Sequence, residues 1–186
     1  GNAEDVFYNI DEYQGVQAAT LFVAYRGYGP SSGKPGEVEL YADALAIVDD
    51  IIRTRAPKEI YLIGRSLGSG VACYVAARRP VQGAILVTPY DSIENVAKSH
   101  YPWMPVAQLL RHRFVSLDSL PQIRCPLLVI YGGADQVIAP KRTENLIRHI
   151  KGEKVSVFIA KADHGTIDMF PDYWPAILRF INREKV

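Results

Sequence analysis

Short apolar runs alternate with amphipathic stretches along this chain. The runs are rich in β-branched and aromatic residues, which is typical of strands buried on both faces of a parallel sheet. They predict five strands, at residues 19–25, 59–64, 83–88, 125–131 and 154–160.

The stretches between these runs have the periodicity of helices. After Glu37, apolar residues recur at steps of three and four and so share one helical face; they are Val38, Tyr41, Leu45, Val48 and Ile52. Further helices are predicted at residues 6–13, 67–79, 140–150 and 173–181. This alternation predicts an α/β fold, with a mainly parallel sheet of about five strands and helices on both faces.

Length and charge narrow the classes of function. The 186 residues are enough for a single domain, 1–186, with a substantial core. Lys and Arg number 21 against 20 for Asp and Glu, so we expect no nucleic-acid partner. The apolar runs fall far short of the ~20 residues of a membrane-spanning helix, so no span is expected. Two cysteines cannot form a disulfide framework, and they give no sign of an oxidising compartment.

The pentapeptide Gly64-Arg65-Ser66-Leu67-Gly68 matches the pattern Gly-x-Ser-x-Gly. It directly follows a predicted strand and opens a predicted helix, which is the context of a nucleophile elbow. Such a turn is strained, so a Cβ on either glycine is expected to collide with the adjacent strand or helix. The serine would project its hydroxyl from the sheet edge, beside the backbone N–H of Leu67 as an oxyanion donor. The alternative is a glycine-rich turn in which the serine only caps the helix.

A nucleophilic serine needs a base, and in this architecture an acid and then a histidine follow it along the chain. His164 is the one histidine that follows a predicted strand, where catalytic residues gather in open α/β sheets. Asp135 lies in the loop after the preceding strand, and Asp168 is a weaker alternative acid. Taken singly, His164 could be a histidine of a surface loop, and Asp135 could be a turn residue. Their order and strand positions nevertheless agree with what Ser66 requires, so we predict a Ser66–His164–Asp135 triad.

Together these motifs resemble the α/β-hydrolase family, and most closely its single-domain serine hydrolases, which include acyl-protein thioesterases and lysophospholipases. The matching segments are residues 1–5, 25–29, 64–70, 89–92, 125–126, 132–135 and 163–165. The resemblance implies that Ser66 is the nucleophile, His164 the base and Asp135 the acid that orients it.

The start of the chain departs from this subgroup. There, a histidine at the end of a central strand precedes Gly-Asn-Ala, and this chain begins one residue after it. The resemblance therefore implies that the N-terminal strands of the fold are absent here, and we expect further residues upstream in the natural protein. It also implies that the second oxyanion donor is the backbone N–H of Asn2 or Ala3.

Substrate contacts are expected from Arg65, beside the nucleophile, and from a short lid at about 91–120. Tyr90 and Trp103 are the candidate aromatic contacts, because binding pockets are lined mainly by apolar groups. The alternatives are a solvated Arg65, and lid residues that only pack onto the core.

These features predict a serine hydrolase that cleaves a carboxylic ester or thioester, in a small molecule or an acylated protein, through an acyl-enzyme. The chemistry needs no metal and no organic cofactor. A peptidase or amidase with the same triad, and a catalytically silent hydrolase-fold binding module, are the alternatives. The oligomeric state cannot be read from the sequence.

Overall fold

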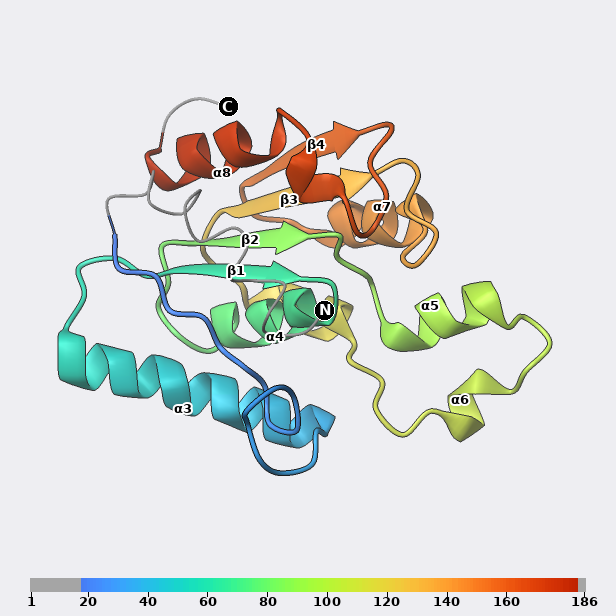
Figure 1. Cartoon of the computed structure of the whole chain (residues 1–186), viewed down its shortest axis with the longest axis horizontal. Coiled ribbons are helices and arrows are strands. Elements are labelled where there is room, and N and C mark those ends of the chain that lie inside the picture. Colours follow the sequence, from blue (N-terminus) through green and yellow to red (C-terminus); the bar gives the residue numbers. More distant parts are fainter. Residues whose placement is uncertain (1–17, 184–186) are drawn as a thin grey trace.

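The computed structural model describes residues 18–183, and its centre is a parallel four-stranded sheet in the order β1-β2-β3-β4 (Figure 1). The strands are β1 (Tyr61–Arg65), β2 (Gly83–Val87), β3 (Leu127–Gly132) and β4 (Lys154–Ile159). Each corresponds to a predicted strand, and the ends differ by two residues at most.

The strand expected at residues 19–25 is not formed, and this prediction is wrong. The run has no regular secondary structure, and Leu21 and Val23 in it are exposed. A strand exists only as one side of a hydrogen-bonded ladder, so β propensity alone does not produce one. Within residues 18–183, β1 pairs with β2 alone and its other edge has no strand partner. The helix predicted at 6–13 lies outside the described residues.

The other predicted helices are confirmed. They are α3 (Glu37–Arg55), α4 (Leu67–Ala76), α7 (Pro140–His149) and α8 (Tyr173–Ile181). The α4 helix ends at Ala76, three residues before the predicted end at residue 79.

Alternate residues of β2 face two different layers of helices. Ala84 and Leu86 lie in a core cluster with residues of α4 and α7, whereas Ile85 and Val87 lie in a second cluster with α8. All four side chains are fully buried. A strand buried on both faces is continuously apolar, which explains why the sequence of β2 shows no alternation of polar and apolar residues.

An extended arm follows β2 and lies beyond the carboxyl ends of the strands (Figure 1). It contains α5 (Ile93–His100) and α6 (Val106–Leu109), and two short 3₁₀ turns, η1 (Ser116–Asp118) and η2 (Leu120–Gln122), lead back to the sheet. An isolated antiparallel bridge between Ser92 and Val115 closes its base. The arm occupies most of the segment predicted to be a lid.

The turn from β1 to α4 is packed too tightly for a side chain at its first glycine. A Cβ on Gly64 would collide with the carbonyl group of Gly68 and would lie 2.8 Å from the Cβ of Ala72. The expectation for Gly68 is corrected, because a Cβ there would meet only the Tyr25 hydroxyl, at 3.2 Å. A side-chain tip can move by a few tenths of an ångström, whereas the backbone under Gly64 cannot.

We therefore expect Gly64→Ala to lower the free energy of unfolding by about 2 kcal/mol, since an added methyl group in a closely packed region forces the backbone apart. Gly152→Ala is the matched control, because a Cβ there has nothing within 4 Å and Gly152 has no positive φ. Urea unfolding of both variants measures the difference. Equal stability of the two variants would contradict the tight packing of the turn.

Candidate active site

Three loops at one edge of the sheet carry the predicted triad. Ser66 directly follows β1, Asp135 lies in the loop after β3, and His164 lies in the loop after β4. The carboxyl ends of parallel strands share one edge, so the topology brings together residues that are up to 98 positions apart.

The loops after β3 and β4 are joined by their backbones. The N–H of Gly133 donates to the carbonyl of Ile159, and the N–H of Ala134 donates to the carbonyl of Ala162, each at 3.0 Å. A Cβ on either Gly132 or Gly133 would collide with the backbone of the facing loop. The loop that carries the acid therefore fixes the position of the loop that carries the histidine.

Ser66, His164 and Asp135 form a chain of short polar contacts. The Nε2 atom of His164 lies 3.0 Å from the Oγ atom of Ser66, and its Nδ1 atom lies 2.8 Å from the Oδ2 atom of Asp135. The Asp135 side chain is 2% exposed and that of His164 is 20% exposed. A histidine held between a buried carboxylate and a hydroxyl can act as a general base toward that hydroxyl.

Ser66 has a backbone conformation that non-glycine residues rarely adopt, with φ 52° and ψ −121°. Such residues cost on the order of 1–3 kcal/mol and persist where their surroundings hold them. Here the Ser66 N–H donates to the Val87 carbonyl at 2.9 Å, and the Ser69 hydroxyl donates to the Ser66 carbonyl at 2.6 Å. The Ser66 side chain makes no capping hydrogen bond to α4, which removes the interpretation of a simple helix cap.

The carboxylate of Asp135 has two separate tasks. Its Oδ1 atom accepts hydrogen bonds from the backbone N–H groups of Val137 and Ile138, at 2.9 and 2.8 Å. Its Oδ2 atom faces His164. The Oδ1 contacts fit the interpretation of Asp135 as a turn residue, and Oδ2 lies where a triad acid would need it.

Arg65 extends toward the histidine loop. Its Nη2 atom donates to the carbonyl oxygens of His164 and Gly165, at 2.9 and 3.0 Å, and its Nη1 atom lies 3.5 Å from Asp168. The side chain is still 39% exposed. Arg65 thus joins strand β1, which precedes Ser66, to the loop that carries His164. The pattern of the sequence did not reveal this contact, because the partners lie about a hundred residues away.

A second support of the histidine loop is Asp163. Its Oδ1 atom accepts from the N–H groups of Gly165 and Thr166, each at 2.8 Å, and from the Thr166 hydroxyl at 2.9 Å. These hydrogen bonds, those from Thr166 first, stabilise the carboxylate and lower the pKa of Asp163 below its usual value of 3.8. An Asp followed by Gly and Thr at this spacing is the sequence signal of such a turn.

The oxyanion donors expected from the sequence have two different outcomes. Leu67 is the first residue of α4, and the N–H groups of a helix's first turn have no partner within the helix. Its N–H is therefore available beside Ser66. Asn2 and Ala3, the expected second donors, lie outside the described residues.

The two predicted aromatic contacts lie in different surroundings: Tyr90 is in the core, and the contact of Trp103 stays a prediction. Tyr90 is fully buried beneath the elbow, where its hydroxyl donates to the Leu67 carbonyl at 3.3 Å. Burial raises the pKa of this phenol well above its usual value, which keeps it neutral. Tyr90 therefore supports the turn from inside the core, in agreement with the alternative that lid residues pack there. Trp103 lies between α5 and α6, and its side chain is 78% exposed.

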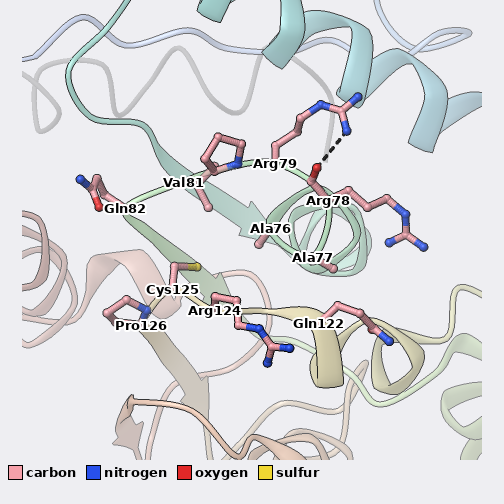
Figure 2. A pocket seen from close by; sticks show the side chains of 11 residues that line it. Ala76, Ala77, Arg78, Arg79, Val81, Gln82, Gln122, Arg124, Cys125 and Pro126 are labelled. Atoms are coloured by element: carbon pink, nitrogen blue, oxygen red, sulfur yellow. Dashed lines mark hydrogen bonds between the residues drawn. The ribbon is translucent and has the colours of Figure 1, made fainter.

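A pocket of about 510 Å³ lies at the other end of the sheet, between the end of α4 and the starts of β2 and β3 (Figure 2). Three arginines line it, but the guanidinium carbon of Arg78 lies 3.5 Å from the centre of the Tyr74 ring, and Figure 2 shows the three guanidinium groups apart from one another. Arg79 donates to the Arg78 carbonyl and to Asp49. The guanidinium groups do not converge on a common point, so this pocket has no built anion site.

Neither a metal site nor a membrane span is found in the described part of the chain. No group of three or more His, Cys, Asp and Glu side chains there is arranged to hold a metal ion. Among the same residues, no helix combines the length and apolar character needed to cross a bilayer.

Comparison with known families identifies the group to which the protein belongs. A family model described as "Serine aminopeptidase, S33" matches residues 14–119, more than half of the chain. This chain belongs to the α/β-hydrolase family. Over residues 18–183, the sheet has four strands, fewer than the full α/β-hydrolase fold.

Curated proteins similar to this α/β-hydrolase are longer than it. "Uncharacterized protein Rv2307c" of Mycobacterium tuberculosis is 31% identical over 176 residues, which cover 92% of this chain and 63% of that protein. "Alpha/beta hydrolase domain-containing protein 17B" of Homo sapiens is 30% identical over 193 residues, which cover 100% and 65%. The chain thus spans just under two thirds of these relatives.

Solved structures support the same fold. An alpha-beta hydrolase from Vibrio vulnificus has a TM-score of 0.75 at 21% identity, covering 96% of this chain and 69% of that one. The Pyrococcus furiosus esterase Pf2001 has a TM-score of 0.70 at 21% identity, covering 87% and 69%. At such identities the likeness concerns the fold alone.

The contacts of Arg65 predict that this side chain positions His164. If they hold the His164 loop in register, Arg65→Gln should slow covalent labelling of the protein by a fluorophosphonate about 10- to 100-fold, since a small misplacement of the base is costly. Arg65→Lys should recover part of the rate, because one ammonium group can still reach a carbonyl. Arg53→Gln, at an exposed ion pair on α3, is the control. An unchanged rate for Arg65→Gln would show that the loop needs no such support.

The lowered pKa of Asp163 predicts the pH range over which the turn at Gly165 and Thr166 is lost. A carboxylate with a depressed pKa stabilises its turn fully above its unfolded pKa, and this is lost as the pH falls through the depressed value. The amide signals of Gly165 and Thr166 in NMR spectra should therefore titrate together, with a midpoint below 3.8. Asp163→Asn should abolish this step. A midpoint at or above 3.8 in the unaltered protein would contradict the role of the turn.

Proposed function

We propose that this protein is a serine hydrolase that cleaves a carboxylic ester or thioester of an acyl substrate through a covalent acyl-enzyme. The observation that carries the proposal is the continuous contact from Asp135 through His164 to Ser66, at 2.8 and 3.0 Å. The substrate is a small molecule or an acylated protein.

In the proposed reaction, the Nε2 atom of His164 takes the proton of the Ser66 hydroxyl as its oxygen attacks the acyl carbon. Asp135 accepts the Nδ1–H of the imidazole and stabilises the cation that forms. The proton then passes from His164 to the leaving oxygen or sulfur, which completes the acyl-enzyme. A water molecule, activated by the same histidine, releases the acid and restores Ser66.

Two features of the elbow favour this use of Ser66. Its strained backbone directs the hydroxyl toward His164 and leaves it without a structural hydrogen bond to the helix. The oxyanion would form beside the N–H of Leu67, where the helix dipole of α4 also favours negative charge. A silent binding module has no need of this strain, so the geometry favours an enzyme.

Two observations bear on the class of bond that is cleaved, and they point in different directions. The matching family model is described as a serine aminopeptidase, which favours an amide. Similar folds include the esterase Pf2001 and an acetyl xylan esterase from Paenibacillus. We retain the ester or thioester as the proposed bond and the peptide amide as the alternative.

Labelling with a fluorophosphonate probe tests for an activated serine. We expect the unaltered protein to be labelled and Ser66→Ala not to react, while Ser99→Ala, at an exposed serine of α5, is labelled like the unaltered protein. Asp135→Asn should lower turnover by a factor on the order of 10⁴, as for the acid of well-studied triads. Absent labelling of the folded protein, or equal labelling of Ser66→Ala, would refute the proposal and favour a silent module.

The bond class is tested by comparing p-nitrophenyl esters of increasing acyl length, a thioester and an amino-acid p-nitroanilide. The proposal expects hydrolysis of esters or thioesters that disappears in Ser66→Ala. Hydrolysis of the anilide alone, also dependent on Ser66, would keep the triad and replace the proposed bond by an amide.

A further inference from the structure

The tip of the arm carries large apolar side chains that the described residues leave open to solvent. Tyr101 and Trp103 lie between α5 and α6, and Leu109 ends α6. Their exposed fractions are 52%, 78% and 63%. By contrast, Val106 and Phe114 in the same arm are buried. The arm therefore has a packed side, which holds it together, and an unpacked apolar tip.

The charged side chains on either side of this tip in the sequence are all basic. Between residues 95 and 117 the sequence contains Lys98, Arg111 and Arg113 and no Asp or Glu. Glu94, at the base, pairs with both Lys98 and Arg113. Residues 94–117, with Glu94 included, therefore carry a formal charge of +2, although the whole chain is close to neutral, at +1.

The base of the arm is attached to the body at two places. The N–H of Arg113 donates to the Glu37 carboxylate at 2.8 Å, and Nε2 of His100 lies 2.8 Å from the Val137 carbonyl oxygen. Val137 in turn donates its N–H to Asp135. The tip extends beyond the carboxyl ends of the strands, at the sheet edge that carries Ser66 (Figure 1).

We propose that this arm docks the protein onto the surface of a membrane that contains anionic lipids. Tyr101, Trp103 and Leu109 enter the headgroup region, and Arg111 faces the lipid phosphates. Tyr and Trp favour this region because each has an apolar ring and a polar group that stays hydrated. Apolar insertion with flanking basic residues is the pattern of segments that lie on a bilayer rather than cross it.

The size of the patch favours a membrane over a second copy of the chain. Three side chains of this kind expose on the order of 400 Å², whereas a stable protein interface needs about 800 Å² from each partner. A bilayer imposes no such minimum, because each inserted side chain gains transfer free energy independently and each cation adds attraction. Docking would also direct the site toward acyl groups held in the membrane, a consequence that rests on the proposed function.

Co-sedimentation with vesicles tests the docking separately from catalysis, because Ser66→Ala protein can be used throughout. We expect it to bind vesicles of equal parts phosphatidylcholine and phosphatidylserine more tightly than vesicles of phosphatidylcholine alone. Arg111→Gln should weaken binding to the anionic vesicles about fivefold and leave the binding to neutral vesicles unchanged.

The apolar part is tested by a matched pair of substitutions. Leu109→Ala should weaken binding on the order of 10- to 50-fold, because three carbon groups no longer leave water. Leu21→Ala removes the same groups from a side chain of similar exposure, 60%, outside the arm, and should have no effect.

Fluorescence gives a second readout, because the chain has two tryptophans and Trp174 packs against the core under α8. Vesicles should shift the emission of Trp103 to shorter wavelengths, and the shift should disappear in Trp103→Phe.

Three results would overturn the docking proposal: no sedimentation with either vesicle, equal weakening by Leu21→Ala and Leu109→Ala, or self-association without vesicles that Leu109→Ala abolishes. The last would assign the tip to a second copy of the chain. None of these results bears on fluorophosphonate labelling of the unaltered protein, so failure of the docking and failure of the hydrolase proposal remain distinguishable.

Discussion

The strained turn at Ser66 is the constraint on which the rest of the site depends. A positive φ at a serine is unfavourable by itself, so the surrounding structure has to hold it. Because Gly64 has no side chain, the first turn of α4 packs directly against the end of β1. The hydroxyl of the buried Tyr90 donates a hydrogen bond to the Leu67 carbonyl. The backbone bond from Ser66 to Val87 ties the turn to the central strand β2. The hydroxyl is thereby directed away from the helix and toward the sheet edge where His164 lies.

Because the sheet is parallel, Asp135 and His164, which follow β3 and β4, lie at the same edge of the sheet as Ser66. Contacts between the loops fix the position of His164 more closely. Backbone hydrogen bonds join the turn after β3 to the turn after β4, and Arg65 donates to the carbonyls of His164 and Gly165. Asp163 then closes the histidine turn from within. Each of these contacts acts on the position of His164, so the histidine loop is the most heavily supported part of the site.

Much of this arrangement could be predicted from the sequence because its signals are local. The runs that form β1 to β4 are apolar and short, and each is followed by turn residues. The ends of these strands could therefore be predicted to within two residues, and the candidate residues could be assigned to the loops that follow them. The failures concern non-local effects. Residues 19–25 have strand propensity but no ladder partner, Tyr90 is buried by segments distant in sequence, and the contacts of Arg65 cross 99 and 100 residues. Local patterns carry no information about such partners.

The central claim is that Ser66 is the nucleophile, and peptide mapping after reaction with a fluorophosphonate tests it most directly. The account predicts one covalent adduct, found by tandem mass spectrometry on Ser66. An adduct on Ser69 or at another residue, or no adduct on a protein shown to be folded, would contradict it.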